Sequence, residues 1–257
     1  MNWLSDTTVA TGDRLEVNVP DTSSLLTDLS ARLKARRGFC VATLNLDHLV
    51  KLRSTPDFRD VYSKFTHVTA DGNPIVWLCR LSGQNVSLVP GSELIDPVME
   101  RAAAADTPVA LFGASDTSLQ TAADTLRVKY PGIQIVLTLA PPMGFDPQGL
   151  AADEAISAIK ASGARLCAVA LGAPKQEIFA IRAQAEMPEC GFLCIGAGLD
   201  FISGAQTRAP ALVRKLALEW AWRMLANPSR LAGRYARCAA LLPGLTYHAL
   251  RTRCSKQ

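Results

Sequence analysis

Short runs of apolar residues alternate along the chain with longer segments in which apolar and polar positions mix at helical spacing. The clearest run, residues 166–171, is apolar at every position and too short for a helix. It therefore predicts a strand buried on both faces, as in a parallel sheet covered by helices. Further buried strands are predicted at residues 39–46, 67–70, 109–112, 133–139 and 192–195. Residues 14–19 alternate apolar and polar positions and predict a short edge strand.

The segments between these strands predict helices. They cover residues 22–36, 55–65, 92–105, 117–129 and 153–161, and two more helices begin near Pro74 and Pro174. Strands that alternate with helices of about 10 to 15 residues indicate right-handed β-α-β units and a parallel sheet. The predicted fold is α/β, a Rossmann-like parallel sheet flanked by helices, with a basic helical appendage at the C-terminus. We expect residues 1–207 to form the Rossmann-like domain and residues 208–257 the appendage.

The composition supports a large folded core. The 257 residues are 49% hydrophobic, which suffices for one large α/β domain with or without an appendage. Seven cysteines form no CxxC pair and lie mostly in apolar runs, a pattern typical of reduced, buried thiols in a cytoplasm. No basic segment followed by an apolar stretch opens the chain, and no run of about 18 apolar residues occurs, so we expect neither a signal peptide nor a transmembrane helix.

Charge is distributed unevenly between the two predicted parts. Residues 208–257 contain ten Lys and Arg but a single acidic residue, so they carry +9, whereas the remainder carries −5. Such a basic segment could face nucleic acid, anionic lipid or a diphosphate. Arginines that only solubilise a helix would be interspersed with Glu and Asp, which are nearly absent here.

Glycines and polar residues directly follow several predicted strands. Ligands of an open parallel sheet bind outside the carboxyl ends of its strands, so these residues are candidates for a ligand site. The candidates for contacts with a nucleotide are Gly113, Gly172, Lys175, Gly196, Gly198 and Asp200. Residues 172–177 also fit an ordinary turn between a strand and a helix, with a solvated Lys, Gln and Glu.

The common nucleotide motifs are incomplete or absent. No GxGxxG sequence occurs, so a dinucleotide enzyme is only weakly supported. No GxxxxGK[ST] sequence occurs either, which excludes phosphoryl transfer on a P-loop. A nucleotide-dependent oxidoreductase on a Rossmann-like fold and a non-catalytic membrane-binding module remain as alternatives.

The order and spacing of these features resemble the WecG/TagA/CpsF family of glycosyltransferases. The resemblance covers roughly residues 39–242 and is most specific in Gly-Ala-Pro-Lys-Gln-Glu at 172–177, Arg-Ala-Pro at 208–210 and Glu-Trp at 219–220. Members are bacterial inverting enzymes of glycosyltransferase family 26. They transfer a sugar from a UDP-sugar to a polyprenyl-diphosphate-linked sugar. The resemblance thus implies a hexosyl- or N-acetylhexosaminyltransferase of cell-surface or exopolysaccharide synthesis, with UDP-N-acetylmannosamine, its uronic acid or UDP-glucose as donor.

The resemblance also implies roles for particular residues. Asp71, which precedes Gly72, matches the family's proposed catalytic base, and such a base would deprotonate the acceptor hydroxyl. An Asp before Gly is also common in a simple turn. Thr43, Asn45 and Gln176 match family residues that could hydrogen-bond a sugar. These three could equally be satisfied caps.

The match is incomplete in the basic positions. Arg223 and Arg230 match basic family positions in the appendage, and we expect them to bind a substrate diphosphate. The third expected Arg falls on Gly233, with Arg234 beside it. A one-residue offset turns a helical side chain by about 100°, which argues against Arg234 as a diphosphate ligand. A family Arg ahead of the segment at 91–93 is replaced by Leu88.

We expect neither a metal nor another cofactor. The sequence contains no DxD motif, so Arg side chains and helix N-termini would have to hold the charge of the departing UDP. The expected partners are the UDP-sugar donor, the polyprenyl-diphosphate-linked acceptor and an anionic membrane surface, without nucleic acid, and a homo-oligomer is left open. The expected location is the cytoplasm, peripheral at the inner face of the cell membrane.

Overall fold

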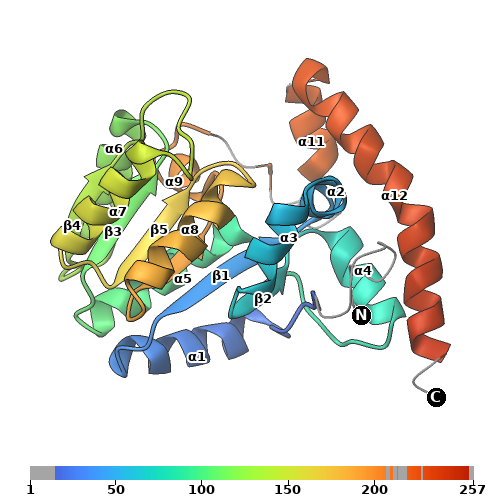
Figure 1. Cartoon of the computed structure of the whole chain (residues 1–257), viewed down its shortest axis with the longest axis horizontal. Helices are drawn as coiled ribbons and strands as arrows, with labels where there is room; N and C mark the ends of the chain where they lie inside the picture. Colours follow the sequence, from blue (N-terminus) through green and yellow to red (C-terminus); the bar gives the residue numbers. More distant parts are fainter. Residues whose placement is uncertain (1–14, 207–208, 211–212, 214–218, 227, 255–257) are drawn as a thin grey trace.

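A six-stranded parallel sheet forms the centre of the protein (Figure 1). The computed structural model describes residues 15–206, 209–210, 213, 219–226 and 228–254, without the side chains of residues 219, 223, 226 and 230. The strand order is β2-β1-β6-β5-β3-β4, and every neighbouring pair is parallel. The strands are β1 (Phe39–Leu44), β2 (His67–Ala70), β3 (Val109–Gly113), β4 (Ile135–Leu139), β5 (Leu166–Ala170) and β6 (Gly191–Cys194). The predicted fold class is confirmed.

Helices cover both faces of this sheet, and each face has its own cluster of buried side chains. One layer contains α2 (Leu46–Ser54), α3 (Pro56–Ser63), α7 (Leu150–Ala161) and α8 (Lys175–Glu186). The other layer contains α1 (Thr22–Lys34), α5 (Gly91–Ala104), α6 (Asp116–Lys129) and the short α9 (Gly198–Ile202). The other helices of the described residues are α4 (Asn73–Leu81), α11 (Glu219–Ala226) and α12 (Pro228–Cys254).

The inner strands divide their side chains between the two layers. In β1, Cys40, Ala42 and Leu44 belong to the cluster under α8, whereas Phe39 and Val41 belong to the cluster under α1 and α5. All six residues of this strand are buried. Burial on both faces explains why the strands are apolar throughout rather than alternating.

Two sequence-based predictions need correction. The segment predicted as an edge strand has the expected alternation of burial over residues 15–19 but is not a strand. It lies beside β2, where the backbone N–H groups of Asn18 and Val19 both donate to the Val68 carbonyl, so no regular ladder forms. The first strand ends at Leu44 rather than at residue 46, because α2 begins directly after Asn45 and precedes the helix predicted at residues 55–65.

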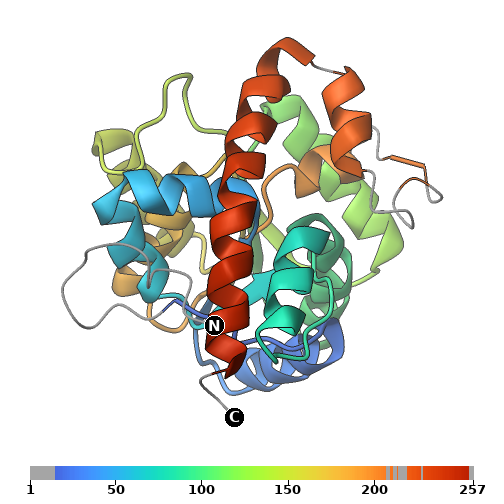
Figure 2. The ribbon, with the colours of Figure 1, turned by 90° about the vertical axis from the view of Figure 1, so that its right-hand side faces the viewer.

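The described part of the appendage lies against the sheet domain. In Figure 2, α12 runs between α2 on one side and α4 on the other, and it contacts both helices. Its Leu245 and Ala249 are buried in the same cluster as the side chains of α2, α3 and α4. Among the described residues, no helix combines the length and the apolar character needed to cross a membrane.

The connections change sides between β1 and β6. The chain leaves β1 into α2 in one layer, whereas it leaves β6 into α9 in the other. Such a reversal at the carboxyl edge of a parallel sheet is where ligands generally bind. Asn45 and Gly196 follow these two strands, so the predicted site residues lie at this edge.

Candidate active site

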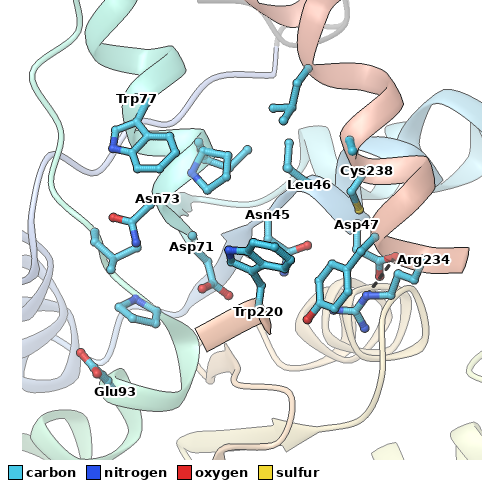
Figure 3. A pocket seen from close by; sticks show the side chains of 18 residues that line it. Asn45, Leu46, Asp47, Asp71, Asn73, Trp77, Glu93, Trp220, Arg234 and Cys238 are labelled. Atoms are coloured by element: carbon cyan, nitrogen blue, oxygen red, sulfur yellow. Dashed lines mark ion pairs between the residues drawn. The ribbon is translucent and has the colours of Figure 1, made fainter. Parts of the chain in front are cut away.

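A cavity of about 550 Å³ lies at the carboxyl ends of β1 and β2, between α4, α11 and α12 (Figure 3). Its wall combines aromatic rings, carboxylates, amides, one guanidinium and aliphatic side chains. The lining residues are Asn45, Leu46, Asp47, Asp71, Gly72, Asn73, Pro74, Ile75, Trp77, Leu88, Pro90, Glu93, Trp220, Arg234, Tyr235, Cys238, Ala239 and Leu242. The appendage therefore supplies one wall of the cavity, and the sheet domain supplies the rest.

Asp71 is held at the cavity by the ends of two neighbouring strands. It follows β2 directly, and its backbone N–H donates to the Leu44 carbonyl over 2.8 Å. The buried Thr43 hydroxyl donates to Asp71 Oδ2 over 3.3 Å. Gly72, with φ of 105°, then turns the chain into α4. This backbone places a carboxylate in the cavity with one oxygen oriented by a neighbour.

Asn45 joins the cavity as the N-cap of α2. Its Oδ1 accepts a hydrogen bond from the His48 backbone N–H over 3.0 Å. This cap uses the amide oxygen of Asn45. The two N–H donors of the same amide can therefore bind a ligand. The structure thus brings Asn45 and Asp71 into one cavity and puts Thr43 in contact with Asp71.

Charged residues connect α2 to the appendage and to the turn before α8. Lys51 Nζ donates to Asp47 Oδ2 over 2.6 Å and to the Ala173 carbonyl over 2.8 Å. Arg234 Nε lies 3.6 Å from Asp47 Oδ1, which is the ion pair drawn in Figure 3. Burial raises the pKa of Asp47, but the hydrogen bond from Lys51 and the nearby Arg234 outweigh burial and lower it. Asp47 thus stays ionised and ties α12 to α2.

The helical offset argued against Arg234 as a diphosphate ligand, and the structure places Arg234 in the lining of the cavity. The cavity side of α12 is formed by Arg234, Cys238 and Leu242, which are four residues apart, together with Tyr235 and Ala239. Residues at this spacing share one face of a helix. The register of α12, rather than the position of Gly233, therefore decides which side chains face the cavity.

Three aromatic side chains line the cavity. Trp77 comes from α4, Trp220 from α11 and Tyr235 from α12. The rings of Trp220 and Tyr235 meet edge to face, with centroids 6.0 Å apart. Arg234 lies over the Tyr235 ring, 5.7 Å from its centroid. Aromatic surfaces beside carboxylate and amide groups are suited to a ligand that is both apolar and rich in hydroxyl groups.

The predicted nucleotide contacts lie at the ends of three adjacent strands, but none of them lines this cavity. Gly113 is required by packing, because a Cβ there would lie 2.3 Å from the Ala170 carbonyl oxygen. Gly172 and Gly196 face open space instead. The Lys175 ammonium donates to the Phe145 carbonyl over 2.7 Å. The role of these residues in nucleotide binding stays a prediction.

The remaining predicted nucleotide contacts, Gly198 and Asp200, belong to α9. A Cβ at Gly198 would lie 3.1 Å from the side chain of Ile195, so the helix packs closely there. Asp200 Oδ2 accepts a hydrogen bond from Gln206 Nε2 over 2.9 Å. Gln176 is buried and makes its contacts within the protein.

The predicted diphosphate ligands are placed only in part. Arg223 and Arg230 belong to α11 and α12, and their side chains lie outside the described part of the chain. Leu88, which the sequence analysis placed where the family has an arginine, lines the cavity. The described residues bring no group of three or more His, Cys, Asp and Glu side chains together in a metal-binding arrangement.

Glu177 was not among the candidate site residues, and the alternative interpretation of residues 172–177 made it a solvated side chain. Its side chain is fully buried. Burial raises the pKa of Glu177 to about 7, and burial lowers the pKa of the neighbouring His48 to about 3. The helical spacing of Gln176, Phe179 and Ala183 was the signal that could have revealed the buried face of α8.

This raised pKa predicts a dependence of stability on pH. The folded state holds the Glu177 proton more tightly than the unfolded chain does, so the stabilising contribution is complete below about pH 4.5 and is lost as pH rises through 7. Relative to Glu177→Gln, the wild-type free energy of unfolding should be roughly 2 kcal/mol lower at pH 8 than at pH 5. Urea unfolding at both pH values measures this difference.

The depressed pKa of His48 costs stability as pH falls below 6.5. His48 titrates in both proteins, so this contribution to the free energy of unfolding cancels in the comparison. The exposed Glu154→Gln is the matched control, and it should show the wild-type dependence. Equal pH dependence in Glu177→Gln and wild type would contradict the burial of an ionisable carboxyl at this position.

The fold and the cavity define the class as a Rossmann-like protein with an aromatic-lined cavity at the carboxyl edge of the sheet, and the Asp71 carboxylate lines this cavity. The model of the Glycosyl transferase WecG/TagA/CpsF family matches residues 13–257, so the chain belongs to this family. It is therefore a glycosyltransferase of cell-surface polysaccharide synthesis that uses a nucleotide-sugar donor and a sugar acceptor. The resemblance recognised in the sequence is confirmed.

Proposed function

We propose that this protein is an inverting glycosyltransferase that moves a hexose or N-acetylhexosamine from a UDP-sugar to a polyprenyl-diphosphate-linked sugar. The candidate donors are UDP-N-acetylmannosamine, its uronic acid and UDP-glucose. The observation that carries the proposal is the Asp71 carboxylate, which lines an aromatic cavity at the carboxyl edge of the sheet. Family membership supports the transfer of a sugar.

In the proposed reaction, Asp71 acts as the general base. The acceptor hydroxyl oxygen attacks the anomeric carbon of the donor and forms the new glycosidic bond. The bond between that carbon and the β-phosphate oxygen breaks, UDP leaves with the electron pair, and the hydroxyl proton passes to Asp71. The hydrogen bond from Thr43 to Oδ2 orients the carboxylate for this proton transfer.

The cavity is proposed to receive the sugar end of the lipid-linked acceptor. Trp220 and Tyr235 offer aromatic surface, and the Asn45 amide offers donors for sugar hydroxyls. Arg223 and Arg230, on the helices that form the appendage wall, are proposed to hold a diphosphate. Gly113, Gly172, Lys175, Gly196, Gly198 and Asp200 are proposed to form the nucleotide side of the site.

The appendage is further proposed to hold the enzyme at the inner, cytoplasmic face of the cell membrane. Trp222 and Leu225 on α11 and Tyr247 and Leu250 on α12 are exposed apolar side chains, and Leu225 is 78% exposed. Exposed arginines accompany them on α12. Apolar and basic side chains on one element suit an interface with anionic lipid.

Ligand binding and transfer test this function directly. We expect the protein to bind UDP and not NAD in calorimetry, because no complete dinucleotide motif is present. One of the three UDP-sugars should yield UDP and a longer lipid-linked saccharide when a polyprenyl-diphosphate-linked sugar is the acceptor. NAD binding without UDP binding would favour an oxidoreductase. Binding to vesicles without binding of UDP or NAD would favour a non-catalytic membrane module.

Transfer is also proposed to need no metal ion. The sequence lacks the DxD carboxylate pair that commonly holds Mg²⁺ or Mn²⁺, so arginines and helix N-termini would neutralise the departing UDP. The initial rate should therefore be unchanged in excess EDTA. An activity that EDTA abolishes and Mn²⁺ restores would show that carboxylates elsewhere in the chain bind a metal.

A further inference from the structure

Gln176 uses both ends of its side-chain amide inside the protein. The Gly196 backbone N–H donates to Gln176 Oε1 over 3.0 Å, and Gln176 Nε2 donates to Glu177 Oε1 over 2.8 Å. Both residues are buried: 3% of the Gln176 surface and 0% of the Glu177 surface are exposed. These contacts favour an indirect role for Gln176 over a direct hydrogen bond to the sugar.

The carboxyl of Glu177 decides which way the Gln176 amide faces. A primary amide has an acceptor end and a donor end, so a half-turn would point its NH₂ group at the Gly196 N–H and break that hydrogen bond. Glu177 Oε1 accepts a hydrogen bond from the Gln176 NH₂ group, which selects the orientation in which the amide oxygen meets Gly196.

The turn that this amide holds connects β6 to α9. Gly196 has φ of 55°, a left-handed conformation that favours glycine. The Gly198 N–H donates to the Ile195 carbonyl over 3.0 Å, so the turn is short and closes directly into α9. Gly196, Gly198 and Asp200 are residues proposed to contact the nucleotide, and their backbone is positioned from this turn.

Glu177 is also connected to the wall of the acceptor cavity. Its Oε1 lies 3.8 Å from His48 Nε2, and His48 Nδ1 lies 3.1 Å from the Tyr62 hydroxyl. His48 belongs to α2, whose N-cap Asn45 lines the cavity. Glu177 Oε2 is buried and has no hydrogen-bond partner among the residues that the structure describes. An otherwise costly buried carboxyl is thus placed between the cavity wall and the β6–α9 turn.

We propose that Glu177 is a positioning residue, which orients Gln176 so that the Gly196 turn is held in the conformation that binds the donor nucleotide. This inference rests on the proposed function, because it concerns the donor side of the same site. Glu177 itself touches neither substrate. It acts through the Gln176 amide, so an oxygen acceptor at position 177 is what the turn requires.

Three variants test this role in the full-length protein, with UDP as the probe. Glu177→Met removes the acceptor at similar volume, and Gln176→Met removes the acceptor for Gly196 while leaving Glu177 in place. Each should raise the Kd for UDP and the KM for the donor by about tenfold, the size expected for one lost hydrogen bond. The kcat at saturating donor should change much less. Glu177→Gln retains an acceptor oxygen and should keep the wild-type Kd.

Hydrogen exchange of the Gly196 amide gives a readout that does not need substrate. Its protection should be lost in both Met variants and retained in Glu177→Gln and in the control Glu186→Met, an exposed position on the same helix. If Glu177→Met does not fold, Gln176→Met and Glu177→Gln still carry the comparison.

Two results would overturn different parts of the argument. Equal UDP affinity in wild type and Gln176→Met would overturn the positioning role alone, as would a Glu177→Gln variant that binds UDP as weakly as the Met variants. A wild-type protein that binds no UDP would instead overturn the proposed function.

Discussion

Replacing Asp71 with Asn should lower the turnover number by about 10²–10⁴-fold, the contribution typical of a general base. The change preserves size and shape, and the Thr43 hydroxyl can still donate to the oxygen of the new amide. The backbone hydrogen bond from residue 71 to the Leu44 carbonyl is unaffected. The fold and UDP affinity should therefore stay at wild-type levels, while initial rates of transfer to the lipid-linked acceptor fall.

Asp47→Asn is the matched control, because Asp47 is a second carboxylate in the same cavity. It loses the ion pairs with Lys51 and Arg234, whose side chains are partly exposed, so turnover should fall by less than about tenfold. A similar loss in both variants would indicate that the cavity requires negative charge rather than a base at one position. Near-normal turnover in Asp71→Asn would remove Asp71 from the proposed mechanism.

The fold was largely predictable because burial leaves a direct mark on the sequence. Strands such as β5, covered on both faces, are apolar at every position, and the turns between them contain glycine, proline and capping residues. The boundary between β1 and α2 was harder to predict. Leu46 and Leu49 are apolar residues near the end of β1, and periodicity alone does not separate the end of a strand from the start of a helix.

The candidate site was predictable where it depends on strand ends, and less so where it depends on helix packing. Asn45 and Asp71 follow neighbouring parallel strands, so the topology brings them to one edge. Arg234 and Tyr235 reach the cavity through the register of α12 against α2 and α4, which the chain's local pattern does not specify. The contact between Gln176 and Gly196 joins residues that are twenty positions apart, and it depends on α8 packing over β6.

Neutralising three exposed arginines of α12 should weaken binding to anionic vesicles by about 100-fold. Each basic residue near an anionic surface contributes on the order of 1 kcal/mol, so Arg237, Arg251 and Arg253 changed together to Ala remove about 3 kcal/mol. Substitution is preferable to deletion of the helix, because Leu245 and Ala249 are buried against the sheet domain. Co-sedimentation with vesicles that contain phosphatidylglycerol measures the change.

The control removes the same charge from the opposite part of the molecule. Lys34, Arg36 and Arg37 are exposed at the end of α1, away from α12 (Figure 1), and their triple Ala variant should bind vesicles like wild type. The weaker vesicle binding of the α12 variant should not depend on salt, because the exposed Trp222 and Leu225 still offer apolar surface. The vesicle binding of the wild type should weaken as salt is added, because salt screens the arginine charges. If both triple variants lose affinity equally, net charge governs the attraction and α12 has no special orientation toward the membrane.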